Sequence, residues 1–169
     1  SGYQAVWEML QEQKRYPAIK IPIVCVPASI DNNLPGAELS IGADTALNNI
    51  TETLDRIKQS ASASRRCFVA ETMGRRCGYL ALMSGIATGA EQVYLSETGV
   101  TLKQLSDDTH RMVDNFKRGR NLYLVVRNEE ASEYYTADVM TQLFQAEGHG
   151  LFDVRTAILG HMQQGGNPS

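Results

Sequence analysis

Residues 27–36 (PASIDNNLPG) place an aspartate, Asp31, shortly after the apolar run 21–26 (IPIVCV). The apolar run is typical of a buried strand. In α/β folds, ligands bind at the carboxyl ends of strands, and a carboxylate there can take a proton from a substrate hydroxyl. The same residue types also form ordinary turns, because Asp, Asn, Pro and Gly tolerate turn dihedrals. Taken alone, this segment favours the turn.

A second polar segment, residues 73–78 (MGRRCG), lies between a strand pattern and a helix pattern. Gly74 would let the backbone approach a ligand, and the start of the helix would supply free N–H donors for a phosphate. Arg75 or Arg76 could add a charged, fork-shaped donor. A tight turn with solvated arginines explains the pattern equally well, so the local sequence leaves both interpretations open.

A third segment, residues 160–166 (GHMQQGG), combines His161 with two amides and several glycines. A lone histidine is more often structural than catalytic, but the glycines favour a ligand-binding loop. The segment lacks the Gly-Lys-Ser/Thr of a Walker A loop. No His or Cys pair in the chain has metal-ligand spacing, and no G-x-S-x-G motif supports a serine nucleophile.

Alternating helix and strand patterns must position these segments. Apolar residues at helical spacing predict helices, and short apolar runs predict strands. We expect helices at 3–14, 42–60, 77–89, 101–117 and 135–147, and strands at 21–26, 67–70, 93–95, 121–126 and 156–159. Helices between strands favour right-handed crossovers and a largely parallel sheet. The polar segments all follow strands, which predicts that they meet at one edge of the sheet.

Composition limits the class of protein. The chain has 169 residues, 43% of them hydrophobic, which is enough for one domain with a core. A net charge of -3 gives no general attraction to nucleic acid or to an anionic membrane. The three cysteines form no C-x-x-C pair, which indicates reduced thiols in a cytoplasmic protein. The first residue is Ser1 and the last residues form a loop, so we expect a piece of a longer chain.

Four motifs together resemble the phosphofructokinase family, at family spacing, over residues 2–166. They are residues 29–33 (SIDNN), 40–47 (SIGADTAL), 71–78 (ETMGRRCG) and 159–166 (LGHMQQGG). The resemblance implies a three-layer αβα fold with a largely parallel sheet, here incomplete. It also implies transfer of the γ-phosphate of ATP, with Mg²⁺, to the 1-hydroxyl of fructose 6-phosphate.

The resemblance also implies a role for individual residues. Asp31 matches the catalytic base. The positions that match substrate-binding residues are Ser29, Arg66, Met73, Gly74, Arg75, Glu129, Arg155 and His161. Among them, Arg66 and Arg155 match arginines that reach a neighbouring subunit's site and bind the 6-phosphate, which implies an oligomer.

Two departures from the family pattern leave an alternative open. Asn33 stands where the bacterial type has a second aspartate, and Gln164 where it has an arginine. Both resemble the carboxyl-terminal halves of large eukaryotic enzymes, in which the site binds fructose 2,6-bisphosphate as an effector. Asp31 and Arg75 look catalytic instead. A pyrophosphate-dependent relative is the third alternative.

The resemblance divides the chain into lobes. Residues 1–42 would end the nucleotide-binding lobe, 43–160 would form most of the sugar-phosphate lobe, and 161–169 would return to the first lobe. The family's glycine-rich ATP loop and its magnesium-binding aspartate segment have no counterpart in this sequence. We therefore expect ATP to bind through an upstream lobe, and we expect no metal ligand in this chain.

Overall fold

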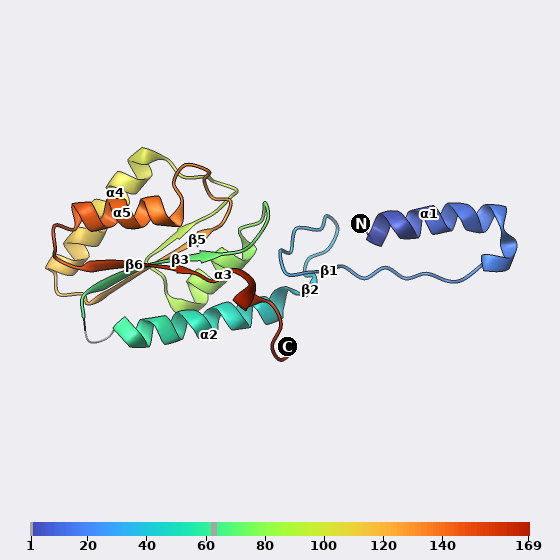
Figure 1. The fold of residues 1–169 in the computed structure, drawn as a ribbon, viewed down its shortest axis with the longest axis horizontal. Helices are drawn as coiled ribbons and strands as arrows, with labels where there is room; N and C mark the ends of the chain where they lie inside the picture. Colours follow the sequence, from blue (N-terminus) through green and yellow to red (C-terminus); the bar gives the residue numbers. More distant parts are fainter. Residues whose placement is uncertain (1, 62–63) are drawn as a thin grey trace.

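The computed structural model describes residues 2–61 and 64–169, which alternate helices and strands along the chain (Figure 1). The elements are α1 (Gly2–Arg15), η1 (Pro17–Ile19), β1 (Ala28–Ser29), β2 (Ile41–Gly42), α2 (Ala43–Ala61), β3 (Arg66–Thr72), α3 (Tyr79–Thr88), β4 (Gln92–Tyr94), α4 (Leu102–Lys117), β5 (Leu122–Asn128), α5 (Ala137–Glu147), β6 (Asp153–Ile158) and η2 (Gly160–Gln163). All five predicted helices are confirmed and differ from the prediction only at their ends.

The main sheet has four strands in the order β4-β5-β3-β6, and every neighbouring pair is parallel. In this register Thr72 lies opposite Asn128, and Glu71 lies opposite Ile158. The carboxyl ends of β5, β3 and β6 are therefore side by side. The strands β1 and β2 form a separate parallel pair. The predicted parallel sheet is confirmed.

Two hydrophobic cores cover the two faces of the sheet. Alternate residues of β3 point to opposite faces, as the two-residue period of a strand requires. Cys67 and Val69 pack with α4 and α5, whereas Phe68 and Ala70 pack with α2 and α3. The result is three layers, with helices on both sides of the sheet (Figure 1). Each layer holds the ends of the central strands in fixed positions.

The predicted strand at 21–26 is wrong. These residues form no strand, and the side chain of Val24 is 85% exposed. An apolar run forms a buried strand only if neighbouring strands accept its hydrogen bonds. No strand within residues 2–61 or 64–169 pairs with it. Figure 1 shows this segment and α1 extending away from the four-stranded sheet.

The last strand also differs from its prediction, because β6 begins at Asp153 instead of 156. β6 lies at an edge of the sheet, and the side chains of Asp153 and Arg155 are both exposed. Because these two residues are charged, the apolar pattern used for the prediction began only at residue 156. Charged residues are common on edge strands, whose outer side is open to solvent. Arg155 is therefore a strand residue.

Candidate functional site

The candidate site lies where β5, β3 and β6 end together. The loop after β3 carries Met73, Gly74 and Arg75, the turn after β5 carries Glu129, and η2 carries His161. Backbone hydrogen bonds continue the sheet into these loops. The Glu129 N–H donates to the Thr72 carbonyl at 2.9 Å. The three loops therefore start from adjacent positions on one edge.

Three glutamates hold the loop that follows β3. The N–H of Gly74 donates to Glu129 Oε1 at 3.0 Å, and the N–H of Arg76 donates to Glu130 Oε2 at 2.8 Å. A third carboxylate, from the loop after β4, accepts the N–H of Gly78 at 2.7 Å; it belongs to Glu97. The expectation that the helix start offers free N–H donors to a phosphate is therefore wrong for the Gly78 amide. Only the third of these amides is at the start of α3, where Gly78 is the N-cap and a negative charge is favoured.

The arginines of this loop remain available to a ligand. The side chains of Arg75 and Arg76 are exposed, and neither forms an ion pair with the described residues. Arg76 adopts a positive φ of 52°, which turns the chain sharply after Arg75. Guanidinium groups bind phosphate through parallel hydrogen bonds. The guanidinium groups of Arg75 and Arg76 are thus available to bind a phosphate.

Glu97 makes one end of this loop sensitive to acid. Partial burial opposes its ionisation, but hydrogen bonds from the Gly78 N–H, its own N–H and the Ser96 hydroxyl outweigh that effect and lower its pKa below the ordinary 4.5. A carboxylate whose pKa is lower in the folded protein than in the unfolded chain stabilises the fold at pH values above the unfolded-state pKa. This stabilisation is lost as the pH falls through the folded-state pKa.

We therefore expect Glu97→Gln to flatten the loss of stability below pH 4.5. Urea unfolding midpoints across the acidic range, for the natural protein and this variant, measure the effect. Glu133→Gln, a change at an exposed glutamate, is the control and should leave the acid response intact. Parallel curves for the natural protein and Glu97→Gln would contradict the role of this carboxylate.

Gln163 ties η2 to the loop after β3. Its side chain is only 1% exposed. Its Oε1 accepts the Met73 N–H at 3.2 Å, and its Nε2 donates to the Gly160 carbonyl at 2.7 Å. This amide brings the segment containing His161 against the Met73 loop. The His161 side chain itself is exposed.

The loop that carries Asp31 follows β1 of the separate strand pair and contacts the loop after β3. Asn33 Nδ2 donates to the Arg75 carbonyl at 2.9 Å, and the thiol of Cys77 lies 3.5 Å from the Asn32 carbonyl. Ser29 Oγ accepts the Asp31 N–H at 3.1 Å and so fixes the start of the loop. Within the described residues, the Asp31 carboxylate makes no hydrogen bond or ion pair, so it is available to a substrate.

The structure does not bring Arg66 and Arg155 to this edge. Arg66 begins the seven-residue strand β3, so it lies ~20 Å from the site at about 3.3 Å per residue. Arg155 is in β6 opposite Phe68, and its guanidinium lies 3.9 Å from the Asp153 carboxylate. Both side chains of that pair are exposed, so the pair contributes little to stability. Arg66 Nε is buried without a hydrogen-bond partner in the described part of the chain.

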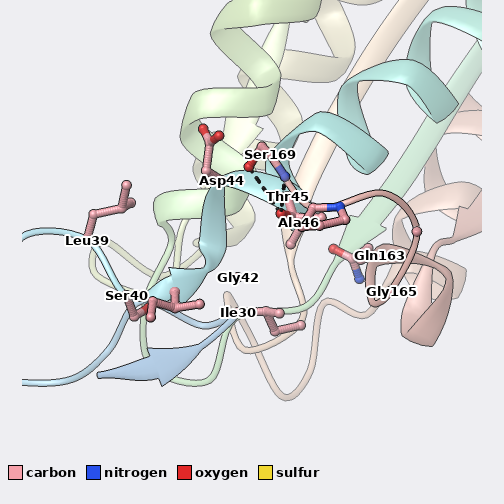
Figure 2. Close-up of a pocket in the computed structure, with 13 residues that line it drawn as sticks. Ile30, Leu39, Ser40, Gly42, Asp44, Thr45, Ala46, Gln163, Gly165 and Ser169 are labelled. Atoms are coloured by element: carbon pink, nitrogen blue, oxygen red, sulfur yellow. Dashed lines mark hydrogen bonds between the residues drawn. The ribbon is translucent and has the colours of Figure 1, made fainter. Parts of the chain in front are cut away.

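A cavity of about 520 Å³ lies between the start of α2 and the tail after η2. Figure 2 shows Thr45 hydrogen-bonded to Ser169, and it labels Gln163 among the residues that line the cavity. Gln163 is the contact between this cavity and the loop after β3. The residues that line the cavity do not include those predicted from sequence. A common cavity for Glu129 and His161 therefore stays a prediction.

Neither a metal site nor a membrane helix is found in the described residues. Among residues 2–61 and 64–169, no group of three or more His, Cys, Asp or Glu side chains could hold a metal ion. None of the described helices has the length and apolar character needed to cross a bilayer.

Sequence reasoning missed several residues that shape the site: Asn128, Glu130, Glu97 and Gln163. Their side chains bond to residues between 1 and 90 positions away. One signal was present, because a buried strand that ends in Arg-Asn-Glu-Glu places four polar groups at one sheet edge.

Comparison with known proteins gives the class. The sequence model of the family described as Phosphofructokinase matches residues 2–169. The chain belongs to the phosphofructokinase family.

Particular relatives agree with this assignment. The ATP-dependent 6-phosphofructokinase of Dictyostelium discoideum is 48% identical over an alignment of 170 positions, which covers 100% of this chain and 20% of the relative. The human platelet type is also 48% identical and is matched over 22% of its length. The crystal structure of Pichia pastoris phosphofructokinase in the T-state superposes with a TM-score of 0.89 at 40% identity, covering 99% of this chain and 19% of that one. This chain thus spans about a fifth of the length of these relatives.

Proposed function

We propose that this chain supplies the sugar-phosphate part of an ATP-dependent 6-phosphofructokinase, which transfers the γ-phosphate of ATP to the 1-hydroxyl of fructose 6-phosphate. The observation that carries the proposal is the contact between two loops. Asn33 and Cys77 join the loop of Asp31 to the loop of Arg75, although the two segments are far apart in sequence. A candidate base and a candidate phosphoryl-binding arginine therefore share one edge.

The proposed chemistry is positioning and charge stabilisation. Asp31 accepts the proton of the attacking hydroxyl. Arg75 offsets the charge that spreads over the transferred phosphoryl group. Glu129 binds sugar hydroxyls, while Ser29 and His161 contact the transferred phosphoryl and the 6-phosphate, respectively. Phosphoryl transfer needs little covalent chemistry from a protein, so these roles are sufficient for the part of the site that binds the sugar phosphate.

Other parts of the reaction belong outside this chain. Residues 1–42 would complete a nucleotide-binding lobe, residues 43–160 the sugar-phosphate lobe, and residues 161–169 the return. The exposed apolar run 21–26 supports this, because Val24 and Val26 need a covering layer that the described residues do not supply. ATP and its Mg²⁺ would bind in that missing lobe, and the free thiols fit a cytoplasmic location.

Arg66 and Arg155 support an oligomer. Both lie away from the chain's own site, and the buried Nε of Arg66 has no hydrogen-bond partner among residues 2–61 and 64–169. We propose that they bind the 6-phosphate in a neighbouring subunit's site. Sedimentation of the full-length protein should then give an oligomer, and an active monomer would contradict this part of the proposal.

The alternative function is a regulatory site for fructose 2,6-bisphosphate. Asn33 favours it, since this amide donates to the Arg75 carbonyl where a second carboxylate would stand in the bacterial type.

Steady-state assays of the full-length protein test the main proposal. They should show ADP formation from ATP that depends on fructose 6-phosphate. Pyrophosphate, whose leaving group would be orthophosphate, is not expected to support phosphorylation of fructose 6-phosphate. Dependence on pyrophosphate in place of ATP would contradict the assignment of the donor.

A further inference from the structure

Asn128, the last residue of β5, has a completely buried side chain. Its Nδ2 donates two hydrogen bonds, to the Gly74 carbonyl at 2.8 Å and to the Cys77 carbonyl at 3.2 Å. Its Oδ1 accepts the N–H of Glu130 at 3.0 Å. One amide therefore joins the loop after β3 to the turn after β5.

Gly74 is held on both sides by this part of β5. Its N–H donates to the Glu129 carboxylate, and its carbonyl accepts from Asn128. The fit is tight, because a Cβ on Gly74 would lie 2.4 Å from the Cys77 carbonyl oxygen and 2.7 Å from Asn128 Nδ2. The conformation of residues 73–77 is thus set by the residues that end β5.

A primary amide suits this position for a chemical reason. It offers two donors and an acceptor without charge, so burial costs little once all three are paired. A carboxylate of the same size would place an oxygen against the carbonyls of Gly74 and Cys77. An alanine would remove the Asn128 partner of the Cys77 carbonyl and of the Glu130 N–H, and would leave the Gly74 carbonyl with only the Cys77 N–H at 3.3 Å. Buried polar groups that lose their partners destabilise a structure.

We propose that Asn128 is a positioning residue for the fructose-phosphate site. It fixes the path of residues 73–77, so that Arg75 and Glu129 face the same sugar phosphate. Asn128 does not touch the ligand and acts through the Gly74 carbonyl. This inference rests on the proposed function, because it assumes that a fructose phosphate binds beside this loop.

Asn128→Asp in the full-length protein tests the inference. Calorimetric titration should show fructose 6-phosphate binding weakened by about 10- to 100-fold, since small displacements of positioning groups have effects of this size. Binding of ADP, which the proposal assigns to the other lobe, should be unchanged. A general loss of structure would affect both ligands, so the difference between them reports positioning.

Thr109→Val is the matched control. It removes another buried side-chain hydrogen bond, from Thr109 Oγ1 to the Leu105 carbonyl at 2.6 Å in α4, away from the site. Both affinities should stay at their natural values in this variant. If Asn128→Asp does not fold, Asn128→Ala, which introduces no charge, gives the same comparison.

Two results would overturn the inference alone: unchanged fructose 6-phosphate binding in a folded Asn128 variant, or equal weakening of both ligands. A natural protein that binds ADP but neither fructose 6-phosphate nor fructose 2,6-bisphosphate would instead overturn the proposed function, and the inference with it.

Discussion

Asp31→Ala in the full-length protein is expected to lower kcat by about 10²–10⁴-fold, the usual contribution of a general base. The carboxylate is half-buried, and its loop is fixed by Ser29 and Asn33. The KM for fructose 6-phosphate should change much less, because a base acts mainly in the transition state. Steady-state kinetics with varied fructose 6-phosphate at saturating ATP measure both quantities.

The matched control is Asp107→Ala, a change at an exposed aspartate in α4, away from the site. It should leave kcat within about twofold of the natural value, as surface substitutions usually have small effects. Intact turnover in Asp31→Ala together with a lost response to fructose 2,6-bisphosphate would favour the regulatory alternative. That result would refute the catalytic assignment of Asp31.

Gly74→Ala is expected to disrupt the site and destabilise the fold together. The residue has a φ of +144°, and its Cβ would meet the Cys77 carbonyl at 2.4 Å. Backbone strain and overpacking should together lower the free energy of unfolding by about 2–4 kcal/mol. Displacement of the loop should weaken fructose 6-phosphate binding by about 100-fold. Urea unfolding and calorimetric titration measure the two effects.

Gly119→Ala separates backbone strain from crowding. Gly119 also has a positive φ, +95°, but a Cβ there would meet nothing within 4 Å. We expect a loss of about 1–2 kcal/mol and no change in sugar-phosphate affinity. Equal losses in the two variants would show that crowding at Gly74 does not matter.

The parts of the fold that could be predicted from sequence are those with a strong local pattern. α2 repeats buried apolar residues at helical spacing, and β3 and β5 are continuous buried runs. The segment 21–26 shows the limit of this reasoning, because its apolar pattern indicates burial but cannot show which strand will pair with it. β6 shows the opposite case, in which the exposed charges of an edge strand conceal its beginning.

The candidate site was predictable in outline and not in detail. Polar residues after consecutive strands indicated one sheet edge, and parallel pairing of β5, β3 and β6 brings three of those loops together. The hydrogen bonds from the Gly74 and Arg76 N–H groups to glutamate carboxylates were not predictable, since they join positions 55 and 54 residues apart. Such pairings follow from tertiary packing and leave no local pattern.

The most direct measurement is a crystal structure of the full-length protein with fructose 6-phosphate. We predict that the sugar phosphate lies within hydrogen-bond distance, about 3 Å, of Glu129 and of the loop that carries Arg75. The 6-phosphate should contact His161. A sugar phosphate bound elsewhere, with Glu129 and Arg75 free of it, would contradict the proposal that these loops form a fructose-phosphate site.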